Sequence, residues 1–200
     1  MREKSVRYFN FGQAFNFKHQ QMKKTIWVCG IIAGIISVSW GVFGESLPAD
    51  SLSLNTRLFL GYATMILAFS LIFVAIKNYR DNYNSGIISF RKALQIGLLI
   101  TLIASTVYVV VWMIDFKYFV HDFGKKYIAQ AVAEMKAKGE STAAMQKETA
   151  NLTASMEKYN TSPLFRILLT YAEIVPVGLV VSLIAALILK NRTKSAAAAA

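Results

Sequence analysis

The chain has 200 residues, of which 55% are hydrophobic and only 16% are charged, and its formal net charge is +11. Such a low charged fraction, spread around long apolar stretches, excludes an ordinary soluble domain. The basic residues lie at the ends of the apolar stretches and not on one soluble face, so nucleic-acid binding is not expected. The composition indicates an integral membrane protein.

Residues that carry redox, metal or hydrolytic chemistry are sparse. Cys29 is the only cysteine, so a disulfide within the chain is impossible, and we expect a buried apolar role for it. His19 and His121 stand without a second ligand at metal spacing. The motifs of nucleophilic, phosphate-binding and metalloprotease sites are also missing. We therefore expect no catalytic residue, no cofactor, no metal and no enzyme activity.

Residues 1–24 are basic, with aromatic side chains interleaved among the charges. This composition is typical of a segment that lies in the headgroup region of a membrane. Tyr8, Phe11, Phe15 and Met22 fall near one face of a helix. Two interpretations stay open: a cytoplasmic or interfacial helix, and a disordered tail.

Four apolar stretches are long enough to cross a bilayer, which takes ~20 residues. They cover residues 25–43, 58–76, 93–112 and 164–189. Small residues recur along one stripe of the first span, and stripes of this kind let helix backbones approach closely. We expect them to pack within the protein's own bundle, with self-dimerisation as the alternative. The residues of these stripes are Gly30, Gly34, Ser37, Gly41, Gly61, Gly97 and Gly178.

The loop at residues 45–56 carries Glu45 and Asp50 and no basic residue, whereas the turn after residue 76 is basic. The positive-inside rule therefore places the loop outside and the turn in the cytoplasm. Asn55 or Thr56 is expected to cap the second span.

The turn between the second and third spans has a distinctive sequence. Asp81 is expected to pair with Arg80, Gly86 to adopt a positive φ, and Ser89 to cap the third span. An aromatic residue at position 90 is expected to anchor at the interface. We interpret this segment as turn construction, with anion binding at a helix N-terminus as the alternative. The residues singled out in this cytoplasmic turn are Tyr79, Arg80, Asp81, Gly86 and Phe90.

Residues 116–162 form the largest segment between spans, and their apolar residues recur with helical periodicity in two parts. Gly139 is expected to stop the first helix and Ser141 to start the second. This pattern predicts an extracytoplasmic helical hairpin whose apolar stripe rests on the membrane surface or on the partner helix. The first stripe comprises Phe116, Phe119, Phe123, Tyr127, Ala131 and Met135, and the second comprises Met145, Leu152, Met156 and Tyr159.

The fourth span contains Arg166, Thr170 and Glu173 at spacings of four and three, which predicts a polar stripe entering from outside. Glu173 is the only carboxylate expected well inside a span, nearer the outer surface than the midplane. Charges there are costly, so a functional hypothesis is warranted. One interpretation is structural, with Glu173 protonated or hydrogen-bonded to a neighbouring span, and the other is a proton or cation site in a shallow outward pocket.

These elements predict an all-α membrane protein in which four transmembrane helices form a bundle. An extracytoplasmic helical hairpin joins spans three and four. Residues 1–24 precede the membrane domain, residues 25–190 form it, and residues 191–200 are a cytoplasmic tail. The basic flanks place both termini in the cytoplasm.

The stretch Tyr79-Arg80-Asp81, followed by residues 86–90, 93–97 and 105–108 and by Trp112, is more particular than a generic loop. It resembles a family of small bacterial four-span membrane proteins, the domain of unknown function 4199 family. The resemblance extends over residues 25–189. It implies a four-helix core in the plasma membrane, and it implies no activity.

Two functions follow from these residues. The first is a non-enzymatic inner-membrane accessory subunit that contacts lipid and binds a protein partner or a second copy of itself. The second is a small oligomeric transporter or channel in which Glu173 is the proton or cation site.

Overall fold

The computed structural model describes residues 11–45, 47, 51–120 and 122–191, and for residues 11–19 and 45 it describes the backbone alone. Residues 11–24 continue the first span as one helix, while residues 1–10 of the predicted N-terminal segment lie outside the described residues. His121, Asp50 and the tail from residue 192 also lie outside them.

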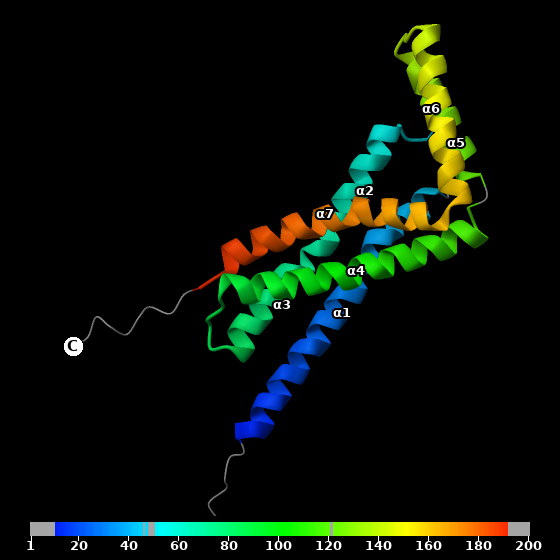
Figure 1. The fold of residues 1–200 in the computed structure, drawn as a ribbon. Helices are drawn as coiled ribbons and strands as arrows, with labels where there is room; N and C mark the ends of the chain where they lie inside the picture. The colour runs from blue at the N-terminus through cyan, green and yellow to red at the C-terminus, as the bar shows by residue number, and fades with distance from the viewer. Residues whose placement is uncertain (1–10, 46, 48–50, 121, 192–200) are drawn as a thin grey trace, which may run out of the picture.

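The described secondary structure is helical throughout (Figure 1). Four helical segments are long and apolar enough to cross a membrane, and the hairpin α5/α6 lies between the third and fourth, as the sequence predicts. The helices are α1 (Phe11–Glu45), α2 (Leu54–Phe69), α3 (Leu71–Asn78), α4 (Phe90–Tyr118), α5 (Phe123–Ala137), α6 (Thr142–Thr161) and α7 (Pro163–Leu189).

The second span is built from α2, α3 and a π-helical turn at Tyr79–Tyr83. At the junction the Ser70 hydroxyl donates to the Leu67 carbonyl over 2.6 Å. A serine that bonds back to its own helix competes with the regular backbone pattern and bends the helix. The interruption between α2 and α3 coincides with this bond.

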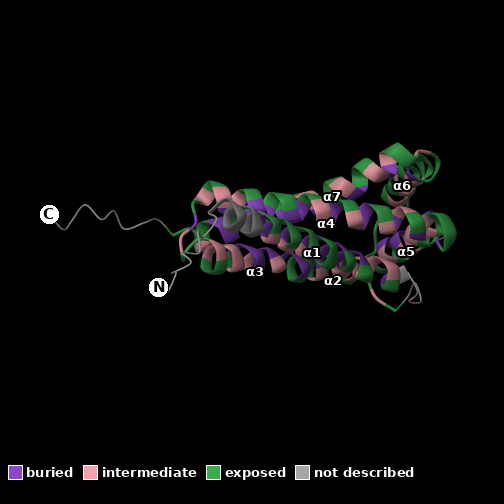
Figure 2. Ribbon diagram, turned by 90° about the horizontal axis from the view of Figure 1, so that it is seen from below, coloured by how far each residue is buried: buried purple, intermediate pink, exposed green. Residues whose placement is uncertain are grey.

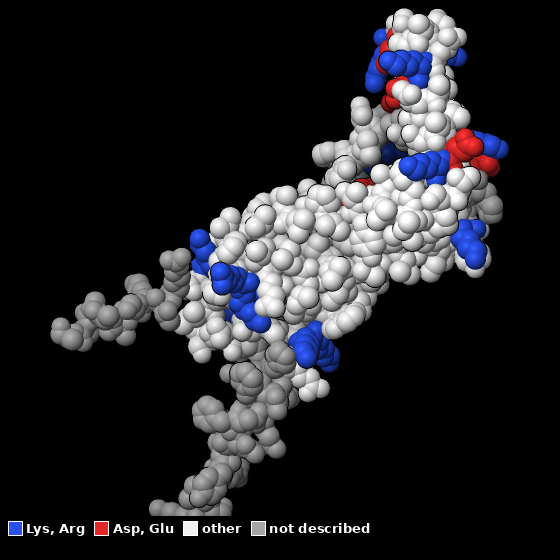
Figure 3. Space-filling view, in the orientation of Figure 1, with Lys and Arg blue, Asp and Glu red and all other residues white. Residues whose placement is uncertain are grey.

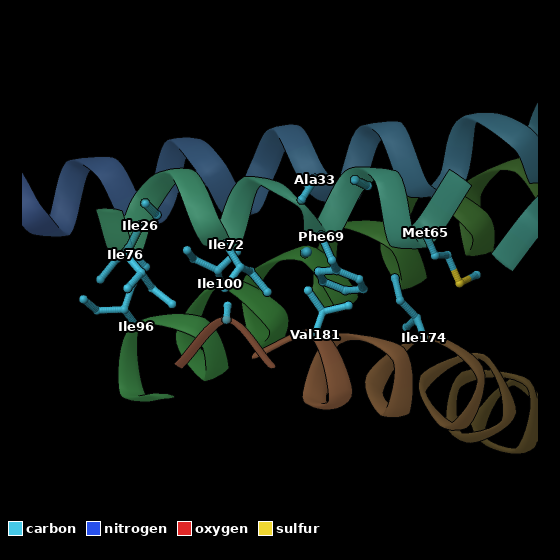
Figure 4. Packing of buried hydrophobic residues seen from close by; sticks show 14 of the residues in the cluster. Ile26, Ala33, Met65, Phe69, Ile72, Ile76, Ile96, Ile100, Ile174 and Val181 are labelled. Atoms are coloured by element: carbon cyan, nitrogen blue, oxygen red, sulfur yellow. The ribbon is translucent and has the colours of Figure 1, made fainter. Parts of the chain in front are cut away.

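The core runs along α4, which packs against α1 on one side and α7 on the other. Figure 4 shows Phe69, Ile72 and Ile100 converging with side chains of α7, and each of these three is fully buried. On the outside the large side chains are apolar, for example Leu67 at 68% exposed. Figure 2 shows exposed residues along the outer sides of the helices, and Figure 3 shows Lys and Arg gathered towards the two ends of the bundle. This is the surface that lipid solvates.

The small residues lie where helices of the same chain meet. A Cβ on Gly34 would stand 2.6 Å from Val107 Cβ and 2.7 Å from the Ala104 carbonyl oxygen. A Cβ on Gly178 would stand 2.4 Å from Thr101 Cγ2. Gly30 meets α4, Gly97 meets Ser182 of α7, Gly61 and Gly41 face tryptophans, and Ser37 is buried. The stripes thus pack inside this bundle.

The turn between the second and third spans is built largely as its residues suggest. Arg80 Nε donates to Asp81 Oδ1 over 2.7 Å, Gly86 has φ +79°, and Ser89 Oγ accepts from Lys92 N. Tyr79 stacks on Tyr83 and faces the Lys92 ammonium, while Phe90 packs against the core. An antiparallel bridge between Ile88 and Asn191 ties this turn to the end of α7.

Two local predictions are wrong. The cap of α2 is Ser53 and not Asn55 or Thr56, because the Ser53 hydroxyl accepts a hydrogen bond from Thr56 N. The helix therefore begins at Leu54, before the expected caps. The third span helix continues to Tyr118, so Phe116 belongs to α4 and not to the hairpin. Gly139, with φ +72°, and the Ser141 cap do mark the tip of the hairpin.

The hairpin α5/α6 does not continue the direction of the spans. In Figure 1 it rises steeply from the ends of α4 and α7 and passes beside the start of α2. Two contacts hold it there: Leu54 N donates to Glu134 Oε1 over 2.6 Å, and Gln130 Nε2 donates to the Leu52 carbonyl over 2.7 Å. The hairpin therefore crosses one end of the bundle, called here the hairpin end.

Candidate functional site

Polar side chains are buried along the inner face of α4. Thr101, Ser105, Tyr108, Trp112 and Asp115 recur at steps of four and three, and all five are buried. Polar groups in a membrane bundle avoid lipid by facing other helices. This row runs from the middle of the bundle to the hairpin end and meets polar residues of α6 and α7.

The inner part of this row joins α4 to α7. The hydroxyl oxygens of Thr101 and Ser182 are 3.1 Å apart, at the point where Gly97 and Gly178 let the two helices approach. Hydrogen bonds between membrane helices contribute about 0.6–2 kcal/mol each. We interpret this contact as helix packing, because the two hydroxyls are buried and pair with each other.

Arg166 fastens the hairpin to the fourth span. It is 6% exposed, and its Nη2 donates to the carbonyls of Tyr159 and Asn160 over 2.9 and 2.8 Å, while its Nε donates to Tyr159 over 3.1 Å. Its guanidinium carbon lies 3.7 Å from the centroid of the Phe116 ring. The last carbonyls of a helix lack partners and carry partial negative charge. The guanidinium satisfies those of α6, and among the described residues no carboxylate pairs with it.

An aromatic cluster closes the same joint. Trp112 Nε1 donates to the Tyr159 hydroxyl over 2.6 Å, and Phe116 and Phe123 contact the Tyr159 ring edge-on and tilted, at 5.5 and 5.9 Å between centroids. Burial raises the pKa of Tyr159, so its hydroxyl stays protonated at neutral pH. Arg166 and this cluster connect α4, α6 and α7 at the hairpin end.

The predicted stripe of Arg166, Thr170 and Glu173 is split. Arg166 and Thr170 are buried, and the Thr170 hydroxyl donates to the Arg166 carbonyl over 2.8 Å. The buried face then continues through Ile174 and Gly178, which leaves Glu173 exposed on the outside of α7. A helix advances 100° per residue, so residue 173 turns away from the face that residues 170 and 174 share.

Glu173 lies near the middle of α7. It lies ten residues from the first residue of α7 and three from Pro176, about 15 Å and about 4.5 Å along the helix axis. Proline has no N–H, so the carbonyl of Ala172 loses its helical donor at this point. Glu173 itself makes no hydrogen bond or ion pair with any residue that the structure describes. The middle of α7 thus presents a carboxylate outward, next in sequence to a carbonyl whose helical donor Pro176 removes.

Sequence reasoning missed Asp115. It ended the third span at residue 112, whereas α4 runs to Tyr118 and buries Asp115 to 8% exposure, with Oδ2 lacking a partner among the described residues. The four–three spacing that joins Thr101 to Trp112 continues to residue 115 and could have revealed it. In the part of the chain that the structure describes, no three His, Cys, Asp or Glu side chains are grouped for a metal ion.

Comparison with known families assigns the chain. Residues 28–191 match the family described as Protein of unknown function (DUF4199), and this match covers most of the chain. The chain belongs to that family, as the turn sequence suggested. No curated protein and no solved structure matches it.

Proposed function

We propose that this DUF4199 protein is a non-enzymatic accessory subunit of the membrane, which binds a protein partner or a second copy of itself through the outer face of α7. Glu173 carries the proposal. It is exposed near the middle of a candidate membrane-spanning helix, and no described residue forms a hydrogen bond or an ion pair with it.

The surroundings of Glu173 show why lipid alone is a poor neighbour. A charged side chain at the centre of a span costs ~2.5–3.5 kcal/mol on insertion scales. The Ala172 carbonyl beside it is deprived of its donor by Pro176 and adds a second unmet acceptor. A facing helix with a lysine, arginine or hydroxyl donor would satisfy both groups at once.

The residues around Glu173 suit helix packing. Leu169 and Val180 lie on the same side of α7 and are 48% and 55% exposed. They supply apolar surface on either side of Glu173, and membrane helices associate through van der Waals packing and interhelical hydrogen bonds. The interior joint at Arg166 is already satisfied, so it supports the shape of this surface and does not take part in it.

The test is the assembly state of the full chain after gentle extraction. Wild type, Glu173→Gln and the control Glu140→Gln, which alters an exposed carboxylate at the hairpin tip, are purified in a mild detergent and weighed by native mass spectrometry. We expect wild type and the control above the 22.3 kDa of one chain. The assembled fraction of Glu173→Gln should fall about three- to tenfold, the effect of losing one hydrogen-bonded contact. Wild type at the mass of one chain, or an unchanged Glu173→Gln, would contradict the proposal.

The Glu173 carboxylate and the neighbouring Ala172 carbonyl favour a second candidate function, a small oligomeric transporter or channel. A carboxylate beside a free carbonyl can hold a proton or a hard cation. Proton and cation flux into vesicles separates the two functions. Flux that disappears in Glu173→Gln while the assembled mass is retained would support transport and would contradict the accessory role.

A further inference from the structure

One side of α7 carries a regular row of exposed residues. Its members follow one another at steps of three, four, three and four residues along the helix. At 100° per residue they stay within a sector of about 80° around the helix axis. The row, called here the α7 stripe, consists of Leu169, Ala172, Pro176, Leu179 and Leu183.

This spacing is the one that brings two parallel helices together. Apolar residues at alternating steps of three and four form the contact line of a left-handed helix pair, and membrane bundles mostly use the same crossing. Ala172 is the smallest residue of the stripe, so a second helix can approach most closely at the level of Glu173. Lipid would also solvate the leucines, so the polar groups beside the stripe decide what covers it.

Polar groups flank the α7 stripe on both sides. On one side lies Glu173, which forms no hydrogen bond or ion pair with any residue that the structure describes. On the other side the Tyr171 hydroxyl donates to Thr106 Oγ1 of α4 over 3.2 Å at an exposed position. Residues 171 and 173 are about 3 Å apart along the helix axis. An acceptor and a donor therefore lie at the same depth on opposite flanks.

The Tyr171 hydroxyl can exchange its present acceptor for a stronger one. Its bond of 3.2 Å is longer than the ~2.7–2.8 Å usual between hydroxyl groups. The Thr106 hydroxyl that accepts it gives its own proton to the Leu102 carbonyl over 2.8 Å. Hydrogen bonds to an ionised carboxylate are about twice as strong as those to a neutral oxygen. The carboxylate of Glu173 in a neighbouring chain would therefore attract this hydroxyl.

We propose that a second copy of this chain covers the α7 stripe, with the two α7 helices parallel and related by a two-fold axis along the membrane normal. Two copies that cross the membrane in the same direction fit this symmetry, because each residue then keeps its own depth. A two-fold axis brings opposite flanks of the stripe together, so Glu173 of each copy faces Tyr171 of the other and the hydrogen bond forms twice. The two carboxylates lie on opposite sides of the helix pair, which limits their repulsion. This inference rests on the proposed role of the outer face of α7 and names its partner.

Disulfide formation in native membranes tests the stripe. In the full chain with Cys29→Ala, Leu183→Cys places one thiol on the stripe. The matched control is Ile184→Cys, because Leu183 and Ile184 are 44% and 45% exposed but point 100° apart around the helix. A disulfide needs Cα atoms within about 7 Å, so we expect mild oxidation to link Leu183→Cys into a species of twice the mass of one chain at least about fivefold more than Ile184→Cys.

Tyr171→Phe tests the polar flank. Added to Leu183→Cys, it removes the hydroxyl, and the cross-linked fraction should fall about three- to tenfold, the effect of losing interhelical hydrogen bonds. The control is Tyr118→Phe, which removes an exposed hydroxyl at the end of α4 and should leave the fraction unchanged. Unchanged thermal unfolding in detergent confirms that both variants are folded.

Several outcomes would overturn the inference. Equal cross-linking at residues 183 and 184 would indicate random collision, and an unchanged fraction in Tyr171→Phe would exclude the contact with Glu173. If Glu173→Gln loses assembly and residue 183 forms no cross-link, a different protein covers the outer face of α7. The accessory role would then stand while this inference fails. Wild type at the mass of one chain would contradict both.

Discussion

At the scale of single residues, close helix approach depends on a few positions without a side chain. Gly34 and Gly41 belong to the same stripe of α1, yet their surroundings differ. A Cβ at residue 34 would be 2.7 Å from a backbone oxygen of α4, whereas one at residue 41 would be 3.6 Å from the Trp112 ring. The first distance is a clash with an atom that cannot rotate away, and the second is an ordinary contact.

Gly34→Ala should therefore destabilise the protein. We expect a loss of about 1–3 kcal/mol, the usual cost of overpacking, seen as a lower midpoint of thermal unfolding in detergent. Gly41→Ala is the matched control and should be neutral or slightly stabilising, because alanine favours the helix and finds room. Equal midpoints for the two variants would contradict the packing of α1 against α4.

A second lesson at this scale concerns charge. Arg166 and Glu173 lie seven residues apart in one helix, and yet their environments are opposite. The arginine is buried and donates to two carbonyls, whereas the glutamate is exposed and has no hydrogen bond or ion pair with a residue that the structure describes. The first is explained within the molecule, so only the second calls for something outside it.

At the scale of elements, the hairpin α5/α6 behaves as an appendage held at its base. Arg166 bonds the last turn of α6, and the Glu134 and Gln130 side chains hold α5 to the start of α2. Beyond these points α6 is mostly exposed. The orientation of the hairpin therefore rests on few contacts, of which those of Arg166 are the most buried.

Arg166→Lys should loosen that base. Lysine keeps the charge but cannot reproduce the forked donation to two carbonyls or the stacking on Phe116. Bonds to charged groups contribute about 1.5–3 kcal/mol each, so we expect hydrogen exchange in the last turn of α6 to accelerate at least about tenfold. Lys147→Gln, on the exposed side of α6, is the control. Unchanged exchange at residues 155–161 in a folded Arg166→Lys protein would show that Arg166 is not the fastening.

At the scale of the whole molecule, the basic turn and the hairpin lie at opposite ends of the bundle. The Ile88–Asn191 bridge keeps the basic turn beside the end of α7, and the hairpin lies at the opposite end of α4 and α7 (Figure 1). From the positive-inside rule we expect the turn to lie in the cytoplasm and the hairpin outside.

Cysteine labelling tests this orientation. In a Cys29→Ala background, Asn84→Cys and Ser155→Cys each introduce one thiol at an exposed position, in the turn and in α6 respectively. An impermeant maleimide added to intact cells should modify S155C strongly, and N84C only after the membrane is opened. The reverse pattern would invert the topology, and labelling of both in intact cells would exclude the four-span arrangement.

The sequence by itself determined the architecture of this protein, because hydrophobic length and turn chemistry are local properties. Runs of apolar residues set the four spans, and Gly86, Ser89, Gly139 and Ser141 set the turn and the hairpin tip. It also identified the family and the small residues that pack. Its errors arose at helix ends, because local propensity does not fix where a helix begins or ends. Ser53 caps α2, and α4 continues through residues 113–118.

Only the tertiary structure decided which polar residues face inward. Arg166, Thr170 and Glu173 share a spacing, but the neighbours of α7 cover the first two and leave the third exposed. Likewise Leu54 and Glu134 are far apart in the chain and form a hydrogen bond only because the hairpin folds back across the start of α2. A side chain's partners depend on which helices surround it, and the periodicity of a single helix contains no information about its neighbours.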